Sequence, residues 1–251
     1  MKTGMIVTDL DRSLLKNDKN ISEYTIKILN SCQKIGLKII FATARPIRST
    51  KNYIDIIKPD GVIFHNGAIV IVDNKILSKN RINPDKTKEI VKKIICDYPS
   101  AAISVEINDT MYTNCDISED WIYTKIDLTE LPNYNADKII IGTISVNEIL
   151  SIKKYITEEL YLEINDEKYG MIMNKKASKW NGIKELSDFF KIEIENIIAF
   201  GDDINDLEMI KNCGKGICVK NGLEEVKAVA KEICEDNEND GIAKWIEKNI
   251  L

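Results

Sequence analysis

The sequence predicts an α/β protein with a parallel sheet, helices on both faces of that sheet, and an α+β domain inserted into the chain. Two observations support this prediction. At both ends of the chain, short apolar segments alternate with amphipathic segments of helical period, which is the pattern of a buried parallel sheet. Between them lie short strands in pairs, as expected of antiparallel hairpins. We therefore predict a core domain of residues 1–80 and 174–251, and an inserted domain of residues 81–173.

Composition and charge exclude several classes of protein. A formal net charge of −5 without a dominant basic block argues against a nucleic-acid partner. No apolar segment approaches the roughly 20 residues of a membrane-spanning helix, and the N-terminus runs into a strand-like segment rather than a secretory signal. The six cysteines are scattered without a C-x-x-C pair, which favours reduced thiols in a cytoplasmic protein. We expect a monomer or a weak homodimer.

The first part of the predicted core alternates strands with helices. Ser22 can cap a helix that ends near Gly36, and Pro46 favours the start of a helix that extends to about Ile57. Asp73-Asn74 is typical of the turn of a hairpin. The predicted strands comprise residues 5–8, 37–42, 61–64, 69–72 and 75–77.

The remaining elements follow from the same patterns. In the inserted domain, helices are predicted at residues 84–95 and 147–158, and strands at 101–107, 111–114, 138–144, 160–164 and 170–173. The last part of the chain returns to the alternation of the first part, which completes a Rossmann-like core. Its predicted strands are residues 196–200 and 216–219, with helices at 178–189 and 203–212 and two more before the C-terminus.

Two carboxylates lie at the end of the first predicted strand. Asp9 and Asp11 follow an apolar run, and open parallel sheets bind their ligands beyond the carboxyl ends of the strands. Carboxylate oxygens suit Mg²⁺, and an aspartate can also act as a nucleophile. An isolated D-x-D pair is more often an Asx turn or the acidic start of a helix. The pair by itself therefore does not distinguish a functional site from a turn or a helix start.

Two further residues lie where a parallel sheet places its ligands. Thr43 ends the second strand ahead of a helix, where a hydroxyl and backbone amides can bind a phosphate oxygen, although a lone threonine there is more often a helix cap. Lys179 begins a helix against the preference of the helix dipole, which favours a functional role near an anionic centre. A solvated surface lysine remains the alternative, and Lys175 and Lys176 compete for the same role.

A second acidic cluster follows a late apolar run. Gly201 permits a sharp turn off the predicted strand, and Asp202 follows it directly. Asp206 comes one helical turn later, so its side chain can face the same site. An acid-rich helix start is also ordinary compensation of the helix dipole. A functional role for this cluster is therefore supported by the other motifs more than by its own composition.

Taken together, these motifs resemble the haloacid dehalogenase superfamily of phosphohydrolases, in its Cof-type branch with a large α/β cap inserted after the second motif. The resemblance spans core, cap and core. The four family motifs are matched in order by Asp9-Leu10-Asp11-Arg12-Ser13, Thr43, Lys179 and Gly201 to Asp206, and a family turn near the substrate is matched by Asn66-Gly67-Ala68.

The resemblance implies a mechanism. Asp9 would attack phosphorus and become an aspartyl-phosphate, while Asp11 would protonate the leaving alcohol and then deprotonate the hydrolytic water. Mg²⁺ would be held by Asp9, the backbone carbonyl of Asp11 and Asp202, with Asp206 in support. Thr43 and Lys179 would bind phosphoryl oxygens, and the implied substrate-binding set is Thr43, Ala44, Asn66, Lys179 and Asn205.

Some positions depart from the family pattern. Arg12 stands where glycine is usual, and either its side chain points away from the site, which we favour, or it binds an anionic substrate. Ser13 replaces the usual threonine and keeps the hydroxyl. Ala44 replaces a customary glycine, and Trp180-Asn181 replaces a usual Lys-Gly after Lys179.

The sequence thus favours a Mg²⁺-dependent phosphatase that acts on a small phosphorylated metabolite, with a sugar phosphate as the preferred class. Selectivity is expected from residues 106–121 and 138–143 of the cap domain. The alternatives are a phosphomutase, which shares the first motif, and a non-catalytic module that binds a phosphometabolite. The intact Asp9 and Asp11 argue against the second alternative, because a binding module needs no nucleophile. A phosphonate hydrolase is less favoured, because its Schiff-base lysine belongs to a cap inserted after the first motif.

Overall fold

The chain forms two compact units in a computed structural model that describes residues 3–118, 121–165 and 168–251. Unit 1 comprises Met1–Lys79 and Ser178–Leu251, and unit 2 comprises Asn80–Ala177. The division lies close to the predicted core and inserted domains, although β11 carries the second boundary past residue 173. The role predicted for the inserted segment, that of a cap, stays a prediction.

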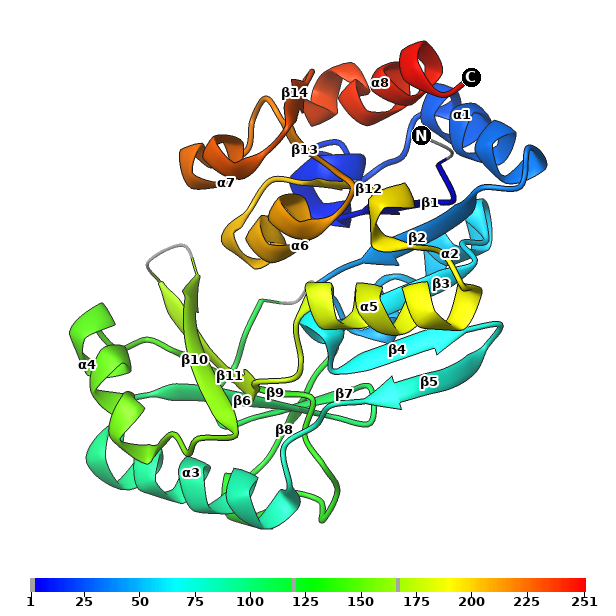
Figure 1. The fold of residues 1–251 in the computed structure, drawn as a ribbon. Coiled ribbons are helices and arrows are strands. Elements are labelled where there is room, and N and C mark those ends of the chain that lie inside the picture. The colour runs from blue at the N-terminus through cyan, green and yellow to red at the C-terminus, as the bar shows by residue number, and fades with distance from the viewer. Residues whose placement is uncertain (1–2, 119–120, 166–167) are drawn as a thin grey trace. The chain divides into compact units, whose positions relative to one another are not determined.

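Unit 1 is built on one eight-stranded sheet with the order β14-β13-β12-β1-β2-β3-β4-β5 (Figure 1). The strands from β14 to β3 run parallel, and β4 and β5 add an antiparallel hairpin at one edge. The strand bounds are β1 (Met5–Thr8), β2 (Lys38–Ala42), β3 (Gly61–Phe64), β4 (Ile69–Val72), β5 (Lys75–Lys79), β12 (Ile197–Gly201), β13 (Lys215–Val219) and β14 (Glu232–Cys234).

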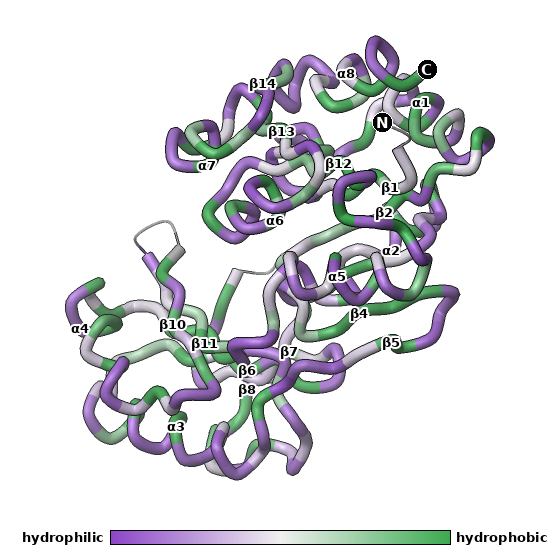
Figure 2. Tube along the Cα trace, viewed as in Figure 1, coloured by the Kyte–Doolittle hydropathy of each residue, from purple (hydrophilic) through white to green (hydrophobic). Residues whose placement is uncertain are grey.

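Helices cover both faces of this sheet, which confirms the predicted α/β fold. One face packs against α1 (Glu23–Lys34), α2 (Lys51–Ile57) and α8 (Gly241–Asn249). The other face packs against α5 (Lys179–Phe190), α6 (Leu207–Asn212) and α7 (Glu224–Val229). Hydrophobic and hydrophilic residues alternate along helices such as α8 in Figure 2, because each helix buries only one stripe against the sheet. The strands between the two helix layers are buried on both sides.

Unit 2 is an α+β unit with a six-stranded sheet in the order β10-β11-β9-β6-β7-β8. One apolar core contains residues of the sheet, of α3 (Pro84–Asp97) and of the 3₁₀ turn that follows α4 (Val146–Ser151). The strands are β6 (Ala102–Ile107), β7 (Thr110–Thr113), β8 (Thr124–Lys125), β9 (Lys138–Gly142), β10 (Leu160–Asn165) and β11 (Tyr169–Asn174). No helix among the described residues is long and apolar enough to span a membrane.

Several predicted helices are shorter than expected. The helix predicted from Pro46 is divided into a 3₁₀ turn, Ile47–Ser49, and α2, because the Thr50 hydroxyl donates to the Pro46 and Ile47 carbonyls at 3.2 and 2.8 Å. Residues 147–158 likewise form α4 and a 3₁₀ turn, and residues 204–206 form a 3₁₀ turn ahead of α6. The short strands β8 and β14 carry too few residues for a visible alternation, so the sequence did not predict them.

Candidate active site

The carboxyl end of β1 is the centre of the site. β1 lies between β12 and β2 and runs parallel to both, so the segments that leave the three strands emerge at one edge of the sheet. Asp9 follows β1 directly, and its backbone N–H donates to the Phe200 carbonyl of β12 at 3.0 Å. This bond fixes the position from which the Asp9 side chain departs.

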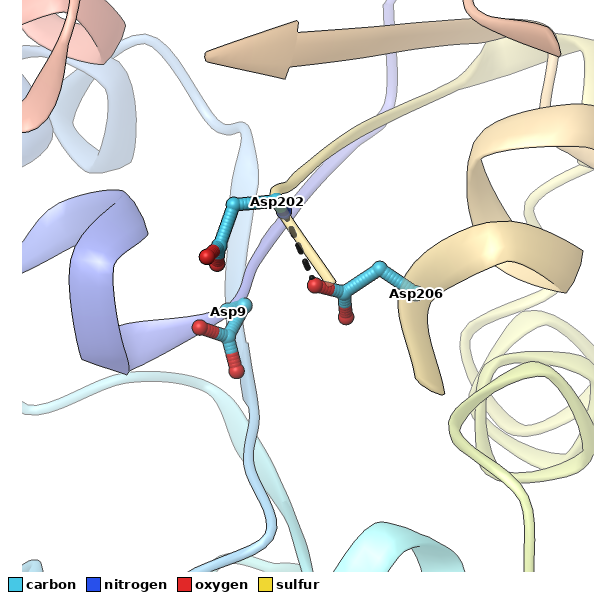
Figure 3. Close-up of side chains that lie close together, drawn as sticks. All are labelled: Asp9, Asp202 and Asp206. Carbon is cyan, nitrogen blue, oxygen red and sulfur yellow. Dashed lines mark hydrogen bonds between the residues drawn. The ribbon is translucent and has the colours of Figure 1, made fainter. Parts of the chain in front are cut away.

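Asp9 meets two carboxylates that come from the distant acidic cluster. One carboxylate oxygen from each of Asp9, Asp202 and Asp206 lies within 4.8 Å of the others, and all three residues are buried. Figure 3 shows the three side chains converging, with the Asp206 carboxylate accepting the Asp202 backbone N–H at 3.0 Å. A Cβ on Gly201 would lie 2.5 Å from Asp206, so the absence of a side chain at Gly201 makes room for this carboxylate. The structure thus brings together Asp9, Asp202 and Asp206 as the sequence predicted.

Lys179 supplies the counter-charge. Its Nζ lies 2.6 Å from Asp9 Oδ1, 2.6 Å from Asp206 Oδ1 and 3.3 Å from Asn205 Oδ1, and the side chain is 1% exposed. Lys179 is the first residue of α5, and Ser178 caps this helix by accepting the Asn181 N–H. Because two carboxylates contact the ammonium, the unfavourable charge at a helix start is compensated.

The competing lysines lie in a different environment. Lys175 and Lys176 are exposed and belong to unit 2, whereas Lys179 is buried in unit 1. The carboxylate contacts therefore single out Lys179, the lysine that the family resemblance also indicated.

Burial dominates the titration of the site. It raises the pKa of Asp9 well above its usual range, with Lys179 opposing the shift and Asp206 adding to it. Burial and the nearby Asp206 raise the pKa of Asp202 to about 7. Burial alone would lower the pKa of Lys179, but Asp206 and Asp9 outweigh it, and the net pKa is raised. The three carboxylates outnumber the single lysine, and a bound cation would relieve this excess of negative charge.

The loops after β2 and β3 meet beside these groups. Thr43 is 1% exposed, and its carbonyl accepts the Asn66 N–H at 3.0 Å, while its Oγ1 accepts the Arg45 N–H. Asn66 Oδ1 accepts Asn205 Nδ2 at 3.2 Å, which links the β3 loop to the residue next to Lys179. Asn66 Nδ2 is buried and has no hydrogen-bond partner among the described residues, so this amide group can donate a hydrogen bond to a ligand.

Replacing Gly67 with alanine should disturb the start of α5. Gly67 has φ +104°, and a Cβ there would lie 2.3 Å from the Ser178 carbonyl oxygen. We expect the free energy of unfolding to fall by at least about 3 kcal/mol, with a loss of activity because Ser178 precedes Lys179. Gly36→Ala is the matched control, since Gly36 has φ +89° and nothing within 4 Å of its Cβ position. It should cost only about 1 kcal/mol in chemical denaturation, and equal losses for the two variants would contradict the steric explanation.

Asp11 lies outside the buried carboxylate cluster. Arg45 donates two hydrogen bonds of 2.6 Å to its carboxylate, from Nε to Oδ2 and from Nη2 to Oδ1. Lys19 Nζ lies 2.9 Å from Oδ1. Burial would raise the pKa of Asp11, but the bonds from Arg45 and Lys19 outweigh it and lower this pKa to about 2. The Asp11 side chain is therefore held as an anion in this conformation, and the structure does not place it with the three other carboxylates.

Arg45 and Lys19, the two partners of Asp11, are not among the site residues predicted from the sequence. Arg45 follows Thr43 by two residues, so its place at the same sheet edge was a signal that could have been used. Lys19 comes from the loop before α1, and only the folded chain brings it to Asp11. Ala44 is half-buried directly after Thr43.

Fold and site together define a hydrolase of the haloacid dehalogenase type. The model of the haloacid dehalogenase-like hydrolase family matches residues 6–246, and the chain belongs to this family. The predicted superfamily and the prediction of a phosphatase enzyme are thereby confirmed, with curated relatives and solved structures in agreement.

Relatives of similar length support the assignment. The chain is 26% identical over 275 residues to the 5-amino-6-(5-phospho-D-ribitylamino)uracil phosphatase YitU of Bacillus subtilis, covering 98% of this chain and 97% of that protein. It is 27% identical to the putative phosphatase YxeH of the same organism, covering 98% of each. A haloacid dehalogenase-like hydrolase from Bacteroides thetaiotaomicron has the same fold, with a TM-score of 0.87 at 20% identity, over 98% of this chain and 99% of that one. The subclass IIB sugar phosphatase BT4131 gives a TM-score of 0.85 at 23% identity, over 98% of each chain.

Proposed function

We propose that this protein is a Mg²⁺-dependent phosphatase that hydrolyses a small phosphorylated metabolite through an aspartyl-phosphate on Asp9. The observation that carries the proposal is the arrangement at the end of β1. Three buried carboxylates lie within 4.8 Å of one another, and a buried lysine contacts two of them. A nucleophile, a cation site and a fixed positive charge are the parts that phosphoryl transfer requires.

The donor set fits a hard divalent cation. Carboxylate and carbonyl oxygens are the ligands that Mg²⁺ prefers, and it keeps several waters and substrate oxygens besides. Asp9, Asp202 and the Asp11 backbone carbonyl would hold the ion. Asp206 would support it indirectly, because its oxygens already bind Lys179 and the N–H groups of Asp202 and Asp203. A bound Mg²⁺ would neutralise charge on the phosphoryl oxygens.

The chain's own residues account for the bond changes. An Asp9 oxygen forms a bond to phosphorus as the bond from phosphorus to the ester oxygen breaks, and the departing oxygen takes a proton from Asp11. Asp11 then accepts a proton from the water that attacks phosphorus, which frees Asp9 and inorganic phosphate. Lys179 and the Thr43 hydroxyl would bind the phosphoryl oxygens. Asn66 Nδ2, which is buried and lacks a hydrogen-bond partner in the described part of the chain, is a suitable further donor.

The proposed role of Asp11 requires a change of its side chain. A carboxylate gripped by Arg45 and Lys19 has a pKa of about 2 and carries no proton to donate at neutral pH. Asp11 must therefore leave Arg45 and turn toward the leaving oxygen before it can act as an acid. Its backbone carbonyl needs no such change to bind a cation.

We further propose that the substrate is a phosphorylated sugar or sugar alcohol, selected by unit 2. BT4131 is named as a sugar phosphatase, and the substrate in the name of YitU carries a phosphoribitylamino group, which supports the proposal by similarity. The predicted selectivity segments, residues 106–121 and 138–143, coincide with β6, β7, β9 and the loops beside them, and residues 119–120 lie outside the described residues. A cytoplasmic location and a monomeric or weakly dimeric state stay predictions.

Phosphate release tests the proposal. We expect the protein to release inorganic phosphate from members of a panel of phosphorylated metabolites, to lose this activity in EDTA, and to recover it with added Mg²⁺. Equal activity in EDTA would rule out the metal requirement. With a hexose 1-phosphate as substrate, formation of the isomeric hexose phosphate in place of inorganic phosphate would instead identify a phosphomutase.

A further inference from the structure

Arg12 occupies a backbone conformation that does not call for a charged residue. Its φ is 59° and its ψ is 2°, in the left-handed region where glycine carries no penalty. A glycine at this position would satisfy the turn after Asp11 with less strain. The guanidinium is therefore an addition to the site that the local fold does not require.

The side chain of Arg12 lies beside Asp202, so the favoured prediction that it points away from the site is wrong. Its Nε lies 3.7 Å from Asp202 Oδ2, and its Nη2 donates to the Asn221 carbonyl at 3.3 Å. Asn221 Nδ2 in turn donates to the Arg12 carbonyl at 2.7 Å. The guanidinium and the backbone of Arg12 therefore both hydrogen-bond to Asn221. The Arg12 side chain is 51% exposed, whereas that of Asp202 is 3% exposed. The guanidinium thus neighbours a buried carboxylate while remaining in contact with solvent.

This contact changes the charge that a cation would meet. Asp202 Oδ1 accepts the Ser13 hydroxyl at 2.8 Å, a neutral donor, so Arg12 is the charged partner of the other oxygen. Asp9, Asp202 and Asp206 carry three negative charges when ionised, and Lys179 offsets one of them. The guanidinium of Arg12, next to Asp202, offsets a second.

We propose that Arg12 is a built-in counter-cation of Asp202 that weakens the binding of a divalent cation at the three carboxylates, an inference that rests on the metal site proposed above. Like charges repel, so a positive group next to a metal ligand lowers the affinity for the ion. Because the guanidinium is half exposed, solvent and salt screen the repulsion, and we expect it to change the affinity about three- to tenfold. The chain would then need a higher Mg²⁺ concentration than a variant without this charge.

Calorimetric titration of the substrate-free protein with MgCl₂ tests the proposal. Arg12→Gln keeps much of the side-chain length but removes the charge, and it should tighten Mg²⁺ binding about three- to tenfold in about 50 mM salt. Arg12→Lys is the matched control, since it retains the charge and should bind within about twofold of the parent protein. All variants are titrated at the same pH, about pH 8.5, well above the ordinary pKa of a carboxylate. The gain in Arg12→Gln should shrink in about 0.5 M salt.

Two results would count against distinct parts of the proposal. If Arg12→Gln binds Mg²⁺ with the parent's affinity or more weakly, while Asp202→Asn loses binding, the metal site stands and the role of Arg12 is wrong. If Asp202→Asn binds Mg²⁺ as the parent does, the proposed metal site itself is wrong. Circular dichroism of each variant confirms that the comparison concerns folded protein, and the stabilisation by Mg²⁺ in thermal unfolding gives an independent order of affinities.

Discussion

Replacing Asp9 with asparagine should lower kcat by about four orders of magnitude or more while the protein stays folded. The amide keeps the shape of the carboxylate but is a poor nucleophile toward phosphorus. Lys179 keeps its contact with Asp206 in this variant, so a neutral side chain at position 9 does not leave the buried ammonium without a partner. We therefore expect the free energy of unfolding to change by only about 1–2 kcal/mol.

The Asp9 prediction is checked with p-nitrophenyl phosphate as substrate and with chemical denaturation of the same samples. Asp18→Asn is the control, because Asp18 is an exposed aspartate in the same segment and its closest partner is Asn20. The control should retain the parent's activity within about twofold. Activity of Asp9→Asn within tenfold of the parent would remove Asp9 from the role of nucleophile.

Replacing Lys179 with methionine should damage both activity and stability. The methionine side chain has a similar length but cannot pair with Asp9 and Asp206, which would be left as buried carboxylates without a counter-charge. Removing one partner of such a buried pair typically costs about 3–5 kcal/mol. We expect kcat to fall by about a thousandfold or more, because the phosphoryl group would also lose a fixed positive charge.

Two comparisons test whether the expected loss of stability in Lys179→Met comes from its buried ion pairs rather than from the removal of any lysine in this segment. Lys175→Met and Lys176→Met replace exposed residues near the start of α5 and should change stability by about 0.5 kcal/mol at most. The double variant Lys179→Met with Asp206→Asn should recover part of the lost stability, because it removes one uncompensated carboxylate. If denaturation shows Lys179→Met to be as stable as the parent, the charge-balance explanation of the site is wrong.

The central strands and the main helices could be predicted from the sequence, because their signals are local. The β1, β2, β3 and β12 segments are apolar runs bounded by turn residues, and α1, α3 and α5 show helical periodicity behind a capping serine or asparagine. Hydrogen bonds from the Thr50 hydroxyl to backbone carbonyls interrupt the helix predicted after Pro46, and the very short strands β8 and β14 were not predicted. These details depend on contacts that a periodic pattern does not contain.

The positions of Asp9, Asp202 and Asp206 followed from the sequence, because residues at the carboxyl ends of neighbouring parallel strands must meet at one edge of the sheet. The contact of Lys179 with Asp9, the bonds from Arg45 to Asp11 and the contact of Arg12 with Asp202 did not follow from it. Lys179 and Asp9 are 170 residues apart, and Arg12 and Asp202 are almost 200 apart. The sequence determined the chemical groups and the edge at which they gather. Only the tertiary structure decided which charges touch, because that depends on side-chain directions fixed by packing between distant segments.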